Sequence, residues 1–277
     1  MYNINRRKFL GLFGCSCCSL ILPSCSTVPI TDRKQLSIIP EAKINSQAAA
    51  AYEQFRTKAK LIKSGPQLKE VIEIGKKIEV SVSSFFENKN EQDPTRNFGW
   101  DYLLVDNDKV ANAWCMPGGK IAFYSGILPV CKNDDGIAAV MGHEIAHAFA
   151  RHTVEKLTQA SMMQMATIGI SRSKYAELLN KSFRVGNVGG NVYNSVVKYG
   201  IFLPFSRKME SEADYLGMGF MNLAGFNIKE PAKLWQRMMA DQEGRMPEFM
   251  GSHPSPDNRS KKFLEWESEI LDKFPRV

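Results

Sequence analysis

The stretch AAVMGHEIAHAFARH, residues Ala138–His152, contains three of the chain's four histidines. His143 and His147 stand four residues apart, so on an α-helix they share one face and both imidazoles can reach the same ion. Glu144 follows the first histidine, where its carboxylate can accept a proton from a water activated by that ion. The pattern therefore predicts a metal site with two histidine ligands and a glutamate as general base.

The residues around this pattern favour a helix. Between Asp134 and Leu157 there is no proline, and apolar residues recur at close to helical spacing. Asp134 and Asp135 stand where an N-cap and a favourable first-turn charge belong. The alternative is a buried helix whose histidines bond to backbone groups, but two histidines and a glutamate are costly to bury without a strong partner.

The whole chain has the length and composition of a globular protein. Its 277 residues hold one large domain or two small ones, and no internal repeat divides them. The net charge of +7 falls to +4 when the basic run at 6–8 is set aside, because 33 basic residues then face 29 acidic ones. There is no basic stripe with interleaved aromatic residues, so we expect no nucleic-acid partner.

The first residues have the organisation of an export signal. A basic run (RRK, 6–8) that resembles a twin-arginine signal precedes an apolar run over 9–22 that is short for a spanning helix. The sequence LPSC, ending at Cys25, resembles a bacterial lipobox with a lipid attached to the cysteine. We expect a signal peptide over 1–24, a tether over 25–40 and a lipid-anchored protein on the periplasmic side, at the outer membrane. An ordinary signal peptide and an uncleaved anchor are the alternatives.

Cysteine usage agrees with one main domain that does not depend on disulfides. Apart from the lipobox cysteine, only Cys115 and Cys131 lie beyond the signal, so there is no disulfide framework and no zinc-ribbon spacing. An oxidising compartment would permit a bond between the two. Their distance is not fixed by the sequence, so their pairing stays open.

A catalytic zinc usually takes three protein ligands, so the histidine pair needs a partner. The best source is SRKMESEADYLG, residues 206–217. Glu210 and Asp214 stand four residues apart on one helix face, so one can bind the metal while the other steadies a ligand histidine. We expect little contribution from Glu212. The alternative is a solvated acidic face, the commoner meaning of such a cluster.

Several motifs, in the same order along the chain, resemble the HtpX-like and CAAX-prenyl-protease group of zinc endopeptidases. The nearest branch contains mitochondrial inner-membrane stress proteases and bacterial periplasmic lipoprotein proteases. The resemblance spans about residues 28–265. The matching pieces are NAW with PGGK (112–120), GHEIAH (142–147), SR with ESEAD (206–214), and HPSP with a following arginine (253–259).

The resemblance implies an α+β, mainly helical, zincin-like metalloprotease domain over 41–277, with a small sheet lining the active-site cleft. One zinc ion per chain would be held by His143, His147 and Glu210, with Asp214 steadying a ligand from behind. His152 departs from the spacing of a further histidine ligand and is interpreted as structural.

In a zincin an edge strand lines the cleft and binds an extended peptide by strand addition. The candidate strand for binding protein or peptide substrates consists of Asn112, Ala113, Trp114, Cys115 and Met116.

The segment GSHPSPDNR (251–259) contains the fourth histidine between restrictive prolines. One interpretation of His253 is a surface-loop residue. The other is a loop folded over the cleft, where His253 occupies the fourth zinc position in a latent enzyme, or, with Arg259, donates to the oxyanion of the tetrahedral intermediate.

These features together predict a zinc-dependent endopeptidase that cleaves envelope or misfolded proteins in periplasmic quality control. One rival is a membrane-tethered, non-catalytic assembly or chaperone-like factor on the same fold, although such a binder has no need of Glu144. The other rival is an amidase acting on cell-wall peptides.

Overall fold

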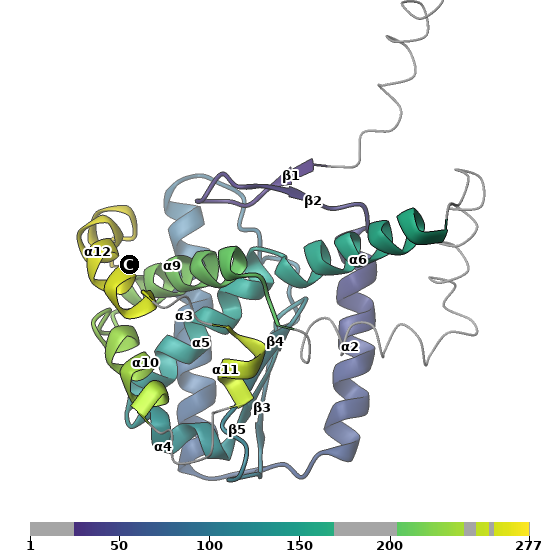
Figure 1. Cartoon of the computed structure of the whole chain (residues 1–277). Helices are drawn as coiled ribbons and strands as arrows, with labels where there is room; N and C mark the ends of the chain where they lie inside the picture. Colours follow the sequence, from purple (N-terminus) through teal and green to yellow (C-terminus); the bar gives the residue numbers. More distant parts are fainter. Residues whose placement is uncertain (1–24, 169–203, 241–247, 255–257, 277) are drawn as a thin grey trace, which may run out of the picture.

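The computed structural model describes residues 25–168, 204–240, 248–254 and 258–276 (Figure 1). The signal peptide expected over 1–24 lies outside these residues. Within the described part, none of the helices combines the length and the apolar character that a bilayer span requires.

The described chain is mainly helical with two small sheets, which confirms the expected α+β class. Its strands are β1 (Cys25–Thr27), β2 (Lys34–Leu36), β3 (Asp101–Val105), β4 (Ala113–Met116) and β5 (Lys120–Tyr124). Its longer helices are α2 (Glu41–Lys58), α3 (Pro66–Asn88), α5 (Asp134–Phe149), α6 (His152–Ile168), α9 (Arg207–Leu223), α10 (Glu230–Ala240) and α12 (Arg259–Lys273). The short helices η2 (Ser125–Ile127), α4 (Leu128–Cys131) and α11 (Glu248–Ser252) complete the set.

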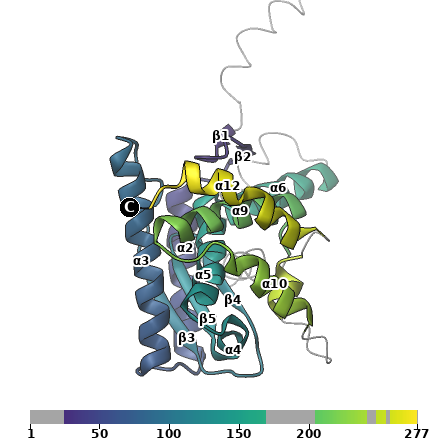
Figure 2. The same ribbon diagram turned by 90° about the vertical axis from the view of Figure 1, so that its left-hand side faces the viewer.

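The larger sheet has the order β3-β5-β4, with β5 parallel to β3 and antiparallel to β4. Strand β4 is therefore an edge strand. Side chains alternate between the two faces, as the pleat requires: Trp114 and Met116 pack with α2, whereas Ala113 and Cys115 join the core around α3 and α5. The sheet thus lies between α2 on one face and α3 and α5 on the other (Figures 1 and 2).

Helices α5 and α9 cross at two glycines. A Cβ added to Gly142 would lie 2.7 Å from the carbonyl oxygen of Gly217, and a Cβ added to Gly217 would lie 2.8 Å from the carbonyl carbon of Gly142. No side chain fits in that space, so the two backbones meet directly. This contact brings the acidic face of α9 against the histidines of α5.

The end of α5 directs a further histidine back towards the metal site. The helix begins at the N-cap Asn133, whose side chain accepts a hydrogen bond from the Gly136 N–H at 2.9 Å, one residue before the expected cap. It ends at Phe149, and Arg151 then takes a left-handed backbone conformation with φ of 57°. The next helix, α6, begins at His152, whose ring lies beside that of His147.

The segment 25–40, expected to be a tether, contains a hairpin that packs on the domain. Strands β1 and β2 pair in antiparallel fashion, and Val28 between them is fully buried in the main core. Strand β2 contacts α6, and Figure 1 shows the hairpin above α9 and α6. From residue 25 onward this segment is therefore part of the folded domain.

Candidate metal centre

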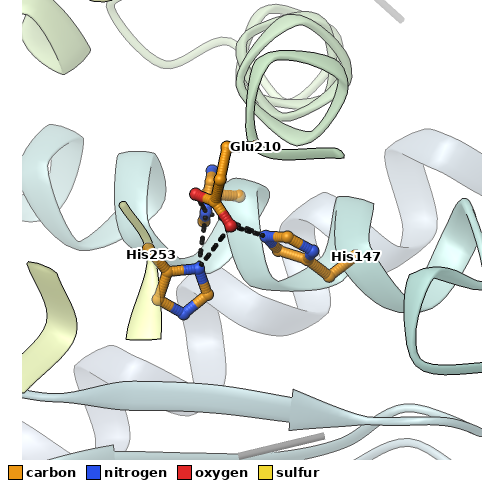
Figure 3. A group of neighbouring side chains, drawn as sticks. His147, Glu210 and His253 are labelled. Atoms are coloured by element: carbon orange, nitrogen blue, oxygen red, sulfur yellow. Dashed lines mark hydrogen bonds and ion pairs between the residues drawn. The ribbon is translucent and has the colours of Figure 1, made fainter. Parts of the chain in front are cut away.

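Four buried side chains converge on one point. His143 and His147 come from α5, Glu210 from α9, and His253 directly follows α11; each offers a ligand atom within 4.8 Å of the others. In Figure 3, Glu210 points between the rings of His147 and His253. The structure thus brings the predicted histidine pair and the predicted third ligand together, and it adds His253.

The spacing of these atoms fits a tetrahedral zinc site. The Nε2 atoms of His143 and His147 are 3.1 Å apart, and they lie 3.4 and 3.3 Å from the Glu210 carboxylate oxygens. The His253 Nδ1 atom is 3.2 Å from both His143 Nε2 and a Glu210 oxygen. Zinc bonds of about 2.0–2.1 Å put tetrahedral ligand atoms about 3.3 Å apart. In addition, the buried Glu210 Oε2 has no hydrogen-bond partner among the described residues.

Behind His143 lies a second layer of charged groups. Its Nδ1 is 3.0 Å from an oxygen of Asp214, which also pairs with Arg259. Burial would lower the pKa of His143, but hydrogen bonds to Asp214 and Glu210 raise it to about 9. The Asp214 contact orients the ring so that Nε2 faces the cluster, as expected for a group that steadies a metal-binding histidine.

Arg259 is buried against these same groups. Its guanidinium stacks over the Trp235 ring with its central carbon 3.3 Å from the ring centre. One guanidinium nitrogen is 3.2 Å from His143 Nδ1, and another is 3.6 Å from Glu210. Arg259 therefore contacts the back of His143 and the carboxylate of Glu210.

Glu144 lies between the cluster and the edge strand β4. Its Oε2 accepts a hydrogen bond from the Cys115 N–H at 3.1 Å, and its Oε1 is 3.3 Å from His253 Nε2. Burial raises the pKa of Glu144 above its ordinary value, although the neighbouring His253 and His143 oppose that shift. A carboxylate with a raised pKa beside a metal site is suited to take up and return a proton.

The edge strand β4 contacts this site through its backbone. The Cys115 N–H reaches Glu144, and the Ala113 N–H is taken by the side chain of Asn112 at 2.9 Å. The Trp114 ring points to the opposite face of the sheet, where it meets Phe55 of α2 edge-on. Met116 is on that face too.

Two residues that the sequence analysis set aside adjoin the site. His152 Nδ1 is 2.9 Å from His147 Nδ1, and His152 Nε2 is 2.8 Å from Glu212 Oε2. Burial lowers the pKa of His152. Burial would raise the pKa of Glu212, but hydrogen bonds from His152, Thr31 and Arg33 outweigh it and lower that pKa. The only sign of this contact in the sequence is spacing: Glu212 follows the predicted ligand Glu210 by two residues, and His152 follows His147 by five.

Cys115 and Cys131 are both free and buried. Cys115 lies on β4, and Cys131 ends α4. Burial raises the pKa of each thiol, that of Cys131 to about 12.

A buried H-E-x-x-H helix joined by a carboxylate from a second helix defines a zincin-type metallopeptidase. The chain belongs to peptidase family M48, whose model matches residues 76–267. Family and cluster together identify zinc as the metal of the site and the chain as a zinc metallopeptidase.

The relatives support this assignment. The chain is 38% identical over 169 residues to the mitochondrial metalloendopeptidase OMA1 of Schizosaccharomyces pombe, covering 60% of this chain and 46% of that protein. It is 24% identical over 269 residues to human metalloendopeptidase OMA1, mitochondrial, covering 93% of this chain and 49% of the relative. The beta-barrel assembly-enhancing protease of Escherichia coli K12 is 24% identical over 161 residues, 57% of this chain and 32% of that protein. The chain spans about half the length of these relatives or less.

The localisation expected from the first residues is wrong. The relatives from Schizosaccharomyces pombe and Saccharomyces cerevisiae, at 38% and 37% identity, are named as mitochondrial, and so is the human relative. They point to mitochondria and not to a lipid-anchored position on the periplasmic side of an outer membrane. That expectation was based on the signal-like residues and the lipobox-like sequence that ends at Cys25. Residues 1–24 lie outside the described part of the chain.

Proposed function

We propose that the chain is a zinc-dependent endopeptidase that cleaves peptide bonds of misfolded proteins. The observation that carries the proposal is the position of Glu144, buried between a zinc-fitting cluster and the edge strand β4. A site that only binds metal has no need of a carboxylate with a raised pKa next to a strand edge.

In this mechanism His143, His147 and Glu210 hold the metal. Bound zinc supplies a Lewis acid that activates water and polarises the scissile carbonyl. Glu144 takes the proton from the water and returns it to the leaving amine. The Cys115 N–H orients the Glu144 carboxylate, and Asp214 orients His143.

The substrate binds along β4 as an added, extended strand. This role rests on two observations: β4 pairs only with β5 among the described strands, so it is an edge strand, and its Cys115 adjoins the Glu144 carboxylate. Main-chain pairing along Asn112–Met116 gives affinity without demanding a particular sequence, which suits misfolded proteins as substrates.

His253 has the role of a latent fourth ligand. Its Nδ1 is 3.2 Å from His143 Nε2 and from a Glu210 oxygen, and its Nε2 is 3.3 Å from Glu144, so this ring would hold zinc as a fourth ligand while it contacts the base. A closed tetrahedral set leaves no open position for chemistry. Substrate must therefore displace His253. The alternative is that His253, with Arg259, donates to the oxyanion during turnover.

Digestion assays separate this proposal from its two rivals. The full chain is incubated with unfolded casein and, separately, with cell-wall muropeptides, each with and without a zinc chelator and with zinc added back. We expect casein cleavage that the chelator abolishes and zinc restores, and no muropeptide cleavage. Muropeptide cleavage alone would favour the amidase. No hydrolysis of either substrate, including by the His253→Ala variant, would favour the non-catalytic factor.

A further inference from the structure

The hairpin formed by β1 and β2 is linked to the metal centre by an unbroken line of hydrogen-bonding side chains. Arg33 Nε donates to Glu212 Oε2 at 2.6 Å, and the Thr31 hydroxyl donates to Glu212 Oε1 at 2.5 Å. The same Glu212 Oε2 is 2.8 Å from His152 Nε2, and His152 Nδ1 is 2.9 Å from Nδ1 of His147. The line joins residues about 180 positions apart in sequence, since Thr31 and Glu212 are separated by 181.

We propose that Thr31 and Arg33 are positioning residues of the metal centre, which act through Glu212 and His152 to fix the orientation and tautomer of His147. This inference rests on the proposed role of His147 as a metal ligand. It assigns a role in metal binding to a part of the chain outside the H-E-x-x-H helix and its partner helix.

The donor and acceptor of each hydrogen bond along this line define the tautomer of His147. The Glu212 carboxylate can only accept, so the proton between it and His152 is on His152 Nε2. In a neutral His152 the Nδ1 atom is then an acceptor, and the proton of the neighbouring contact is on His147 Nδ1. A neutral His147 with its proton on Nδ1 has its lone pair on Nε2, the atom that faces Glu210 at 3.3 Å.

Burial makes these contacts strong determinants of geometry. His152 is 0% exposed and Glu212 is 8% exposed. Water therefore does not compete for these groups, and each hydrogen bond is stronger than at a surface. A buried carboxylate also needs its full set of partners, since an unpaired one is costly. The hairpin supplies two of the three partners of Glu212.

Arg33 also ties two helices together. Its Nε contacts Glu212 of α9, and its Nη1 is 2.8 Å from Glu155 of α6, one turn after His152. The side chain of Arg33 is 12% exposed, so this bridge lies mostly beneath the surface. Arg33 thus holds the Glu212 carboxylate in place relative to α6. His152, which donates a hydrogen bond to that carboxylate, is the first residue of α6.

The test compares zinc affinity with the stability of the metal-free protein in full-length variants. Glu212→Gln removes the charged acceptor, Thr31→Val removes one donor at constant shape, and Thr31→Ser retains the hydroxyl. Zinc Kd is measured by competition with a chromophoric chelator, and cobalt(II) spectra report the ligand field. Loss of groups that orient a metal-binding histidine typically weakens metal binding about 10- to 100-fold. We expect this weakening and an altered cobalt spectrum for Glu212→Gln, a smaller effect for Thr31→Val, and recovery in Thr31→Ser.

Arg237→Lys is the matched control. Arg237 forms a partly buried pair with Glu230 at 2.7 Å and donates to the carbonyl groups of Val130 and Cys131, away from the metal cluster. We expect this variant to lower the unfolding temperature of the metal-free protein without changing zinc Kd. If Glu212→Gln behaves like this control, with reduced stability and unchanged zinc Kd, the residues are only structural and the inference is wrong.

The readout separates this inference from the proposed function. Zinc Kd and cobalt spectra do not depend on proteolysis, so they remain informative if the protein cleaves no substrate. His147→Ala serves as a reference: unchanged zinc affinity in that variant would overturn the ligand assignment itself. Weak zinc binding in His147→Ala combined with wild-type binding in Glu212→Gln would overturn only the role of the hairpin.

Discussion

Gly142 and Gly217 meet backbone to backbone where α5 crosses α9, with no room for a side chain on either. Gly142 directly precedes His143, and Gly217 lies two turns after Glu210; both side chains belong to the candidate metal site. The closeness of the two helices therefore sets the distance of 3.3 Å between His147 and Glu210. A packing contact between glycines thus governs the geometry of the metal centre.

Gly217→Ala should separate the two helices. We expect a loss of about 1–3 kcal/mol in the free energy of unfolding, typical of overpacking, together with weaker zinc binding. Chemical denaturation and zinc titration measure the two effects. Gly99→Ala is the control, because the atom nearest to its added Cβ is the far end of the Lys120 side chain, Nζ at 3.2 Å, and not backbone. Wild-type zinc affinity in Gly217→Ala would show that the crossing does not set the site.

Glu144→Gln should retain about one zinc per chain and lose nearly all peptide hydrolysis, because the amide cannot accept the proton. Metal analysis and a casein assay measure both properties. Glu87→Gln, at an exposed position near the end of α3, serves as the control with unchanged activity. Substantial residual cleavage in Glu144→Gln would rule out its role as the base.

Glu210→Ala should lose both zinc and activity, because it removes the carboxylate shared by the cluster. Asp214→Asn should weaken zinc binding by about 10- to 100-fold, since it loosens the hold on His143. Equilibrium dialysis against a zinc buffer measures both. The assignment fails if Asp214→Asn loses zinc completely while Glu210→Ala retains it.

His253→Ala should raise basal cleavage of casein, because it opens the fourth metal position while three ligands remain. Zinc content should stay near one per chain. If His253 supports the oxyanion instead, kcat should fall by about 10- to 1000-fold. Steady-state kinetics separates the two results, and unchanged rates with unchanged zinc affinity would leave the buried His253 with a structural role alone.

Zinc binding should depend steeply on pH. Burial lowers the pKa of His143, but Asp214 and Glu210 outweigh burial and raise that pKa to about 9. Below that pH the metal must therefore displace a proton from His143. A group with a raised pKa is protonated at lower pH, so zinc affinity should increase by about tenfold per pH unit up to about pH 9 and then level off. Chelator competition across this range measures the slope. A constant Kd below pH 9 would contradict the prediction.

The sequence predicted which side chains gather at the candidate metal site because their spacing is local. Residues four apart on a helix share a face whatever the rest of the fold does, so the pairs His143–His147 and Glu210–Asp214 could be found from spacing alone.

The remaining parts of the site depend on contacts between distant segments. Nothing in the spacing of Glu212 indicates that it faces His152, because that contact requires the break at Arg151 and the docking of the hairpin. Arg259 was expected near the reacting atoms, and its burial over Trp235 follows from how α10 and α12 pack. Such long-range packing leaves no periodic trace in the sequence.

The separation of the ligands along the chain also orders events during folding. His143 and His147 lie one turn apart, whereas His253 is 110 residues from His143. Contacts between distant residues form late, because closing the intervening chain costs entropy. Before α9 docks on α5, a metal ion meets only two imidazoles and is held weakly. We therefore expect the chain to bind zinc firmly only as it completes its fold, and a half-folded chain to lack peptidase activity during its own synthesis.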